Sequence, residues 1–222
     1  MTVRPILTWP DQRLTLKSLP VEIFDEDLAC LIRDMVDTVN VNHAIGLAAP
    51  QVDVLKRVVV IKRDAVEGES GEDLVLINPT IDLSGEQNKS KESCLSVPGF
   101  SGDVMRASDV QVTYQNVDGE SCSLEATGAL SAVIQHECDH LEGVLYLHRM
   151  KRVARTALTK RVRKHQKEED QKLAEYREQL KIELAEVWSS TDGAKPSRRP
   201  SAKAIARKKA ARKSRRKNRR LR

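Results

Sequence analysis

The sequence lacks several features that would point to export or to a membrane. It has no apolar run of about 18 residues, so no membrane-spanning helix is expected. Its first twenty residues, MTVRPILTWPDQRLTLKSLP, do not show a charged stretch followed by an apolar one, and a secretory signal is not expected. The four cysteines lie at positions 30, 94, 122 and 138, without the spacing of a disulfide framework. These absences predict a cytoplasmic protein whose cysteines are structural, metal-binding or incidental.

Acidic residues are absent from the last part of the chain. Residues 195–222 hold 15 of the 38 Lys and Arg residues and no acid, which leaves 23 bases against 32 acids, a net charge of −9, for the rest of the 222 residues. No aromatic residue interrupts this basic segment, so base stacking is not indicated. We predict a disordered basic tail over residues 189–222 that either binds an acidic partner such as ribosomal RNA or is solvated and non-specific.

Residues 1–150 show the patterns of one compact α+β domain. Apolar residues at three- and four-residue steps predict an amphipathic helix within residues 24–42. Short β-branched runs at 57–62 and 73–79 predict buried strands, the second ending at Pro79. Asp118 and Gly119 predict a hairpin turn. A second helix is expected to begin after Gly128 and to end near Gly143.

Residues 151–188 predict a long and largely solvated helix. Nearly every second residue is charged, and the segment contains neither Gly nor Pro. One narrow apolar stripe follows helical spacing, formed by Leu173, Tyr176, Leu180, Leu184 and Val187. The stripe can pack against the domain, pair with another helix or dock on a specific partner, and the sequence leaves these alternatives open.

The hexapeptide QHECDH, residues 135–140, lies within the second predicted helix. Because residues four apart share a helix face, His136 and His140 can bind one metal ion. Glu137 is about 100° around the helix from His136, beside the metal and not in competition for it, where a carboxylate can accept a proton from water. The alternative is a polar stretch of an ordinary surface helix, but the preceding apolar ALSAVI indicates burial.

A catalytic metal site of this kind needs a third protein ligand. Cys94, in KESCLSVPG, offers a thiolate beside a Pro-Gly turn, and the alternative is a buried free cysteine. Cys30 and Cys122 are interpreted as buried free cysteines, the first on the apolar face of its helix. Cys138 is about 200° around the helix from His136 and is expected to point away from the metal.

The stretch HAIGLAAPQV, residues 43–52, is small and apolar apart from Gln51 and His43. Small residues allow a backbone or a substrate to approach closely. Gln51 is either exposed in a tight turn between helix and strand, or buried as an amide donor that stabilises a developing oxyanion.

Three motifs in this order, AIGLAAPQ, ESCLS and QHECDH, resemble those of the peptide deformylase family, whose members remove the formyl group from N-formylmethionine of nascent chains. The resemblance covers residues 4–150, and ILTWPDQRL and the INP at 77–79 are also similar. It implies an α+β fold with mixed or antiparallel sheets packed around a central metal-binding helix. The long C-terminal helix and the disordered basic tail would follow this catalytic domain of residues 1–150.

The resemblance also implies roles for individual residues. The metal ligands would be Cys94, His136 and His140. Glu137 would be the general acid and base, while the Gln51 side chain and the Leu95 backbone N–H would hold the oxyanion. The residues implied at the substrate are Ile45, Gly46, Glu92, Arg106 and Val133.

Two departures from the family pattern bear on substrate preference. Ala44 and Ser93 stand where the family has glycines, and each would cost on the order of 1 kcal/mol or shift a loop if its position required a positive φ. We expect altered substrate preference more readily than lost activity.

The implied cofactor is one divalent metal ion, with Fe²⁺ favoured natively and Zn²⁺, Ni²⁺ or Co²⁺ as alternatives. The implied partners are N-formylated nascent peptides and, through the helix and tail, the ribosome or its RNA, with no membrane. Two other functions stay open: a hydrolase for other acylated or short peptides, and a ribosome- or RNA-binding module with a structural metal. Glu137 argues against the second, because a structural site has no use for an acid beside the metal.

Overall fold

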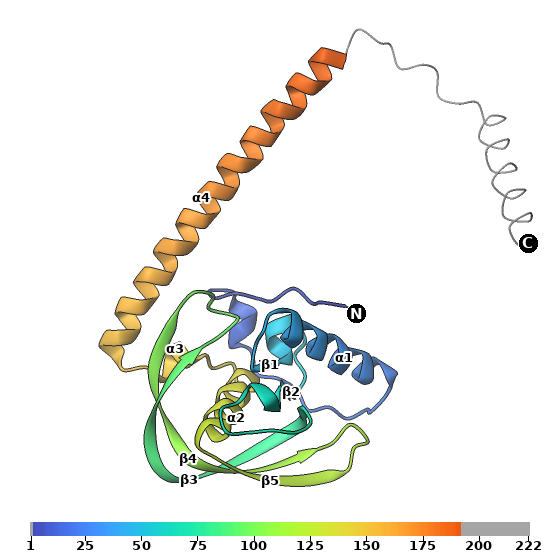
Figure 1. Cartoon of the computed structure of the whole chain (residues 1–222), viewed down its shortest axis with the longest axis vertical. Helices are drawn as coiled ribbons and strands as arrows, with labels where there is room; N and C mark the ends of the chain where they lie inside the picture. The colour runs from blue at the N-terminus through green and yellow to red at the C-terminus, as the bar shows by residue number, and fades with distance from the viewer. Residues whose placement is uncertain (1, 192–222) are drawn as a thin grey trace, which may run out of the picture. The chain divides into compact units, whose positions relative to one another are not determined.

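The computed structural model describes residues 2–191, with side chains described up to residue 185. Contacts between residues divide the chain into two units, Met1–His165 and Gln166–Arg222. The first unit extends past residue 150 and includes the beginning of the long C-terminal helix (Figure 1). The candidate site lies within this first unit.

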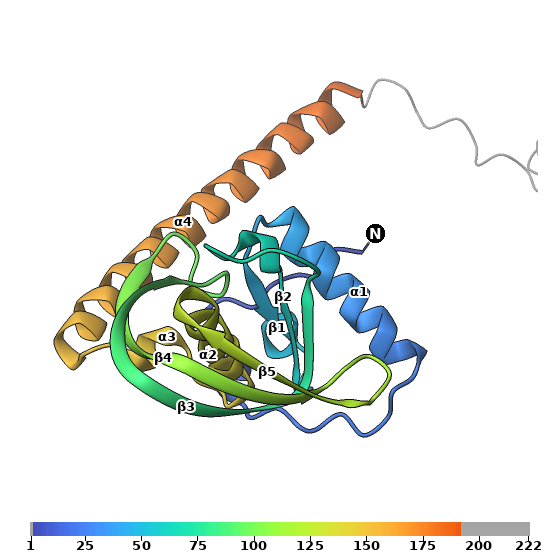
Figure 2. The same ribbon diagram turned by 60° about the horizontal axis from the view of Figure 1, so that its bottom comes forward.

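The first unit contains a five-stranded antiparallel sheet in the order β1-β2-β3-β4-β5. The strands are β1 (Gly46–Ala48), β2 (Val58–Ile61), β3 (Leu74–Ser93), β4 (Ser101–Gln115) and β5 (Ser121–Thr127). The long strands β3 and β4 curve around a central helix, α2, so that one sheet surrounds it on more than one side (Figure 2). The α+β class with a central helix is confirmed.

Helices lie before, between and after these strands along the described chain. They are η1 (Gln12–Thr15), α1 (Glu26–Val41), η2 (Ala49–Val52), η3 (Arg63–Ala65), α2 (Gly128–Leu141), α3 (Tyr146–Arg149) and α4 (Arg152–Thr191). Asp25 caps α1 by accepting a hydrogen bond from the Leu28 N–H at 3.0 Å. The apolar face predicted for this helix is buried, with Met35 fully enclosed.

Strand β2 separates two parts of the hydrophobic core. Val58 and Val60 pack in the cluster that contains α1, whereas Val59 and Ile61 pack in the cluster that contains α2. Because successive side chains of a strand point to opposite faces, a strand covered on both faces must be apolar throughout. This arrangement explains the unbroken run VVVI, and β2 pairs with β1, which contributes Gly46 to the site.

The prediction that Pro79 ends a strand is wrong, because β3 continues from Leu74 to Ser93. The register with β4 shifts between Ile77 and Thr80, so neither Asn78 nor Pro79 has a partner there. Asn78 adopts φ 51°, and its side chain bonds the backbone of Val21 in both directions at 2.8 Å. The bulge accommodates a proline without loss of a ladder hydrogen bond.

The other predicted elements are confirmed. Residues 116–120 close the β4–β5 hairpin, with Gly119 at φ 81° and the Asn116 N–H bonded to the Glu120 carbonyl at 2.9 Å. Helix α2 spans Gly128–Leu141, and Gly143 follows it at φ 71°. A left-handed glycine just after a helix is a common terminator.

Helix α4 is the long helix expected from residue 151 onward. Leu158 and Val162 are buried within the first unit. Leu173, Tyr176, Leu180 and Leu184 of the predicted stripe are exposed, and the Val187 side chain lies beyond the described ones. Of the tail predicted at 189–222, residues from 192 onward lie outside the described residues. No helix among residues 2–191 has both the length and the apolar character needed to cross a membrane.

Candidate active site

Three potential metal ligands lie together where Cys94, directly after β3, meets two histidines of α2. The ligand atoms of Cys94, His136 and His140 all lie within 4.8 Å of one another, and Cys94 Sγ is 3.3 Å from His140 Nε2. The histidines are one turn apart on α2, with ring centroids separated by 5.0 Å. A thiolate with two imidazoles suits Zn²⁺ or Fe²⁺, and the donor set therefore fits a divalent ion.

His136 is oriented by a buried network of charges. Its Nδ1 lies 2.7 Å from Glu92 Oε2, and Glu92 in turn receives hydrogen bonds from Arg106 Nε at 2.7 Å and Nη2 at 3.0 Å. Arg106 also binds Asp139 at 2.7 Å, and Asp139 accepts from Arg149 at 2.6 and 3.1 Å. A carboxylate at Nδ1 leaves Nε2 of His136 for the metal, which is the usual second-sphere arrangement.

Arg106 lies behind His136 and not in the substrate cleft, which corrects its expected position beside the substrate. Its side chain is 6% exposed, and it is absent from the residues that line the cleft. Burial disfavours the charged forms of both Glu92 and Arg106. Hydrogen bonds from His136 and Arg106 nevertheless lower the pKa of Glu92, and the hydrogen bonds that Arg106 donates to Glu92 raise the pKa of Arg106.

The two histidines have opposite electrostatic surroundings. Burial lowers the pKa of His140 well below its ordinary value, and its Nδ1 has no hydrogen-bond partner among the described residues. Burial also acts to lower the pKa of His136, but hydrogen bonds to Cys94 and Glu92 raise it well above its ordinary value. His140 is thus held as the neutral imidazole, the form that binds metals.

Glu137 is buried beside the three ligands without a complete set of partners. Glu137 is 5% exposed, and its Oε2 has no hydrogen-bond partner among the described residues. Burial raises the pKa of this carboxyl to about 7. A carboxyl group that titrates near neutrality can both accept and donate a proton at the pH of a cell.

The glycine at position 46 leaves room for Glu137. A Cβ atom at Gly46 would lie 2.5 Å from Glu137 Oε1 and 2.9 Å from Cδ, which is closer than real contacts allow. Its φ is not in the left-handed region, so the requirement is for space and not for backbone freedom. Strand β1 and helix α2 therefore approach one another at the carboxylate.

Gln51 is buried, which excludes the interpretation of an exposed turn residue. Its Oε1 accepts a hydrogen bond from the Ala48 N–H at 2.8 Å, and its Nε2 points to Cys94 Sγ at 3.3 Å and to Ser96 Oγ at 3.1 Å. The Leu95 N–H has no acceptor in the described part of the chain. One N–H donor thus points to the Cys94 thiol, and the backbone N–H of the next residue has no partner in the described part of the chain.

Ser96 is a site residue that sequence reasoning missed. It is fully buried, and its hydroxyl fixes the amide of Gln51. The available signal was a serine within the quoted ESCLS motif, next to the proposed ligand and oxyanion donor.

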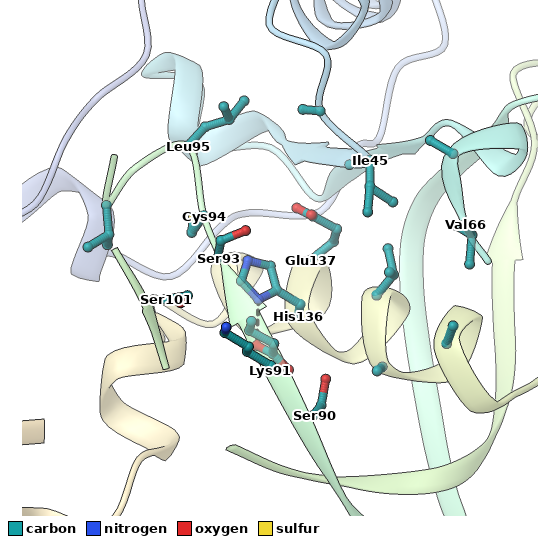
Figure 3. Close-up of a pocket in the computed structure, with 18 of the residues that line it drawn as sticks. Ile45, Val66, Ser90, Lys91, Ser93, Cys94, Leu95, Ser101, His136 and Glu137 are labelled. Atoms are coloured by element: carbon teal, nitrogen blue, oxygen red, sulfur yellow. Dashed lines mark hydrogen bonds and ion pairs between the residues drawn. The ribbon is translucent and has the colours of Figure 1, made fainter. Parts of the chain in front are cut away.

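A cleft of about 980 Å³ opens onto these residues. Of the residues expected at the substrate, it is lined by Ile45, Gly46, Glu92 and Val133. Figure 3 places Ile45 and Val66 on one side of His136 and Glu137, and Leu95 and Ser101 on the other. Sequence reasoning missed Val66, Phe100, Ala129 and Ala132, which also line the cleft.

Neither departure from the family pattern strains the backbone. Positive φ values among the described non-glycine residues occur at His43, Asp53 and Asn78, and not at Ala44 or Ser93. Ser93 ends β3 opposite Ser101 of β4. The predicted cost of strain is therefore absent, while the predicted change in substrate preference stays a prediction.

The remaining cysteines differ in their surroundings. Cys138 is buried in the core, as expected for a residue that points away from the ligands. Cys30 is exposed beside Arg33, so its expected burial is wrong. The apolar face of α1 is narrower than the sequence pattern suggested, and position 30 lies outside it. Cys122 is half-buried.

A buried Cys-His-His cluster, a carboxylate beside it and an open cleft define a metal-dependent hydrolase. The profile of a family described as polypeptide deformylase matches residues 3–156. The chain belongs to the polypeptide deformylase family.

Relatives and solved structures agree with this membership. A peptide deformylase of Hahella chejuensis is 44% identical over 168 residues, which cover 75% of this chain and 98% of the relative. A peptide deformylase of Thermomicrobium roseum is 42% identical over 153 residues, covering 68% and 87%. The crystal structure of a peptide deformylase from Legionella pneumophila superimposes with a TM-score of 0.70 at 36% identity, covering 76% of this chain and 98% of its own. That from Ehrlichia chaffeensis in complex with actinonin gives 0.69 at 39%, covering 74% and 98%.

Proposed function

We propose that this chain hydrolyses the formamide bond of N-formylmethionine at the start of nascent polypeptides, releasing formate and a free amino group. The observation that carries the proposal is the carboxyl group of Glu137, buried beside three metal ligands at the base of an open cleft. Family membership supports the same reaction.

Cys94, His136 and His140 would hold one divalent ion. Three protein ligands without a fourth are typical of catalytic and not of structural sites, and the cluster has three members among the described residues. When bound, the ion acts as a Lewis acid that lowers the pKa of water and polarises the formyl carbonyl. We propose Fe²⁺ as the native ion and Zn²⁺, Ni²⁺ or Co²⁺ as substitutes, because thiolate and imidazole suit all four.

The protein's own groups supply the proton transfer and the charge stabilisation. Glu137 accepts a proton from the attacking water and gives it to the leaving nitrogen, a cycle that its pKa of about 7 permits. Gln51 Nε2 and the Leu95 N–H donate hydrogen bonds to the oxyanion of the tetrahedral intermediate. The apolar side of the cleft, with Ile45 and Val133, would receive the methionine side chain.

A hydrolase for other acylated or short peptides is the second candidate. Ala44 and Ser93 lie at the cleft and replace glycines of the family pattern, which supports a different substrate preference. A panel of acyl groups and first residues separates the two candidates.

We further propose that catalysis resides in residues 1–150, and that helix 151–188 and tail 189–222 attach this cytoplasmic enzyme to ribosomes. The 15 basic residues between 195 and 222 support attachment to RNA. Binding that weakens steeply with salt and prefers ribosomes over random RNA is the expected result. Equal binding to both RNAs contradicts the specific version.

The reaction is tested by anaerobic incubation of the iron-loaded protein with formyl-Met-Ala-Ser and measurement of formate. Rapid release that Glu137→Ala abolishes is the expected result. If folded, metal-loaded protein releases no formate, the proposal fails and the substrate panel becomes the next measurement.

A further inference from the structure

The rim of the cleft is packed against the beginning of α4. Phe100 lines the cleft and also packs in the cluster that contains Val97, Leu158 and Val162. Leu158 and Val162 lie just beyond residue 156, where the family profile ends. The beginning of α4 therefore supports a wall of the cleft.

Two polar side chains of α4 contact the ring of Phe100 directly. The Arg161 guanidinium lies over the ring, 5.7 Å from its centroid, and the His165 ring meets it edge-on at 5.6 Å and 66°. A cation over an aromatic face within about 6 Å is attracted by the ring quadrupole. The Phe100 carbonyl also accepts a hydrogen bond from Tyr146 Oη at 3.2 Å. The ring is thus fixed from the helix and the backbone from α3.

The rim lies on the far side of the reacting groups from the apolar pocket. In Figure 3, Ser101, which follows Phe100, and Val66 are on opposite sides of His136 and Glu137. If the methionine side chain occupies the apolar side, the residues that follow methionine can leave the site along the rim. A dipeptide would end before the rim, and a longer peptide would reach it.

We propose that Arg161 and His165 are positioning residues that hold Phe100 where it contacts the substrate residues following N-formylmethionine. The proposal rests on the function proposed above and deepens it, because it assigns the beginning of α4 to the recognition of longer peptides. Neither residue touches the reacting atoms, and their effect passes through the ring of Phe100.

Substrates of two lengths test the proposal. Formyl-Met-Ala and the pentapeptide formyl-Met-Ala-Ser-Ala-Ala are compared with the full chain and with Arg161→Ala, His165→Ala and the double variant. Each lost ring contact is expected to raise KM for the pentapeptide about two- to fivefold, with kcat unchanged. KM for formyl-Met-Ala is expected to stay the same. Lys160→Ala, on an exposed position of the same helix turn, is the matched control and is expected to change neither value.

Peptide binding is measured as well, with Glu137→Gln as the background so that turnover is slow during the measurement. Pentapeptide affinity that falls with Arg161→Ala and His165→Ala, while dipeptide affinity does not, supports the proposal. An equal loss for both lengths, or no loss for either, overturns it. If the unsubstituted chain binds both peptides but releases no formate, only the proposed function fails. If it binds neither, both fail.

Phe100→Leu provides a second variant that keeps an apolar side chain but removes the ring. It is expected to reproduce the length-dependent effect, and adding Arg161→Ala to it is expected to have no further effect on KM. Additive effects of the two substitutions would show that Arg161 acts independently of Phe100 and would overturn the proposal. Thermal unfolding of each variant shows whether it is folded at the assay temperature.

Discussion

Helices α2 and α4 carry similar polar residues but place them in opposite surroundings. Ten of the fourteen residues of α2 are buried, among them two histidines and two acids. Of the described side chains of α4, those buried are Leu158 and Val162, while its many charges face water. The comparison shows that burial, and not residue type alone, decides whether the polar side chains of a helix form a reactive site.

The difference is visible in individual carboxylates. Burial raises the pKa of Glu137 to about 7 and leaves one of its oxygens without a partner. On α4, Glu169 and Glu178 form ion pairs with Lys172 and Lys181 at 2.9 Å, at positions where water and salt screen them. Burial gives Glu137 a pKa that suits proton transfer. The exposed glutamates of α4 form screened ion pairs on the surface of the helix.

Removing the acid from each helix gives the largest expected contrast. Glu137→Gln is expected to lower kcat about 10²–10⁴-fold, because proton transfer by a positioned side chain contributes this much. Metal content, measured by elemental analysis, is expected to stay near one ion per chain, since Glu137 is not a ligand. Glu175→Gln, on the exposed part of α4, is the control and should leave kcat unchanged. Wild-type turnover by Glu137→Gln would contradict the assignment.

Breaking ion pairs on a buried and an exposed surface gives the next contrast. Arg106→Ala leaves Glu92 and Asp139 buried with fewer partners, and a loss of about 3–5 kcal/mol in the free energy of unfolding is expected. Arg33→Ala, which removes the exposed pair with Glu26, should cause no measurable loss. Urea denaturation of both variants checks this. Equal losses would mean that burial is not what makes the Arg106 network important.

The sequence predicts the elements whose burial follows a regular pattern. Helix α1 has apolar residues at helical steps, and β2 is a short apolar run, so both could be located before the structure. The second half of β3, residues 80–93, is mostly exposed and polar, and its strand character comes from pairing with β4. Pairing of exposed, polar residues with a neighbouring strand leaves no alternating apolar pattern, which is why this half was missed.

The same reasoning applies to the site. Cys94, His136, Glu137 and Gln51 could be predicted, because their chemistry is unusual in an apolar setting and their motifs match a family. The rim contact between Phe100 and α4 could not, because Arg161 is one of many charges on a solvated helix and nothing in its neighbours distinguishes it. Only the tertiary structure shows which charge meets a ring.

Two leucines of α4 represent the packed beginning of the helix and its exposed remainder. Leu158 is 6% exposed in a cluster beside the cleft rim, whereas Leu180 is 37% exposed. Leu158→Ala is expected to lower the free energy of unfolding by about 2–3 kcal/mol, through lost burial and the cavity left behind. Leu180→Ala should change it by less than about 0.5 kcal/mol, as for most surface substitutions. Similar losses in chemical denaturation would mean that the stripe from Leu173 to Leu184 is covered in solution.

The smallest expected effect tests how closely α2 is enclosed. In Gly46→Ala the added methyl group would lie 2.5 Å from Glu137 Oε1, so the carboxylate must move within a site that has little free space. Because a misplaced catalytic group loses its alignment with the reacting atoms, kcat is expected to fall about tenfold, equivalent to about 1.4 kcal/mol in the barrier.

Ala44→Gly, two residues away at the same cleft, is the matched control. Its φ is not in the left-handed region, so restoring glycine relieves no strain and kcat should stay the same. A fall for Gly46→Ala without a fall for the control locates the constraint at Glu137. Unchanged turnover in both variants would show that the carboxylate has the freedom of a side chain on α4, and that enclosure is not what prepares it for catalysis.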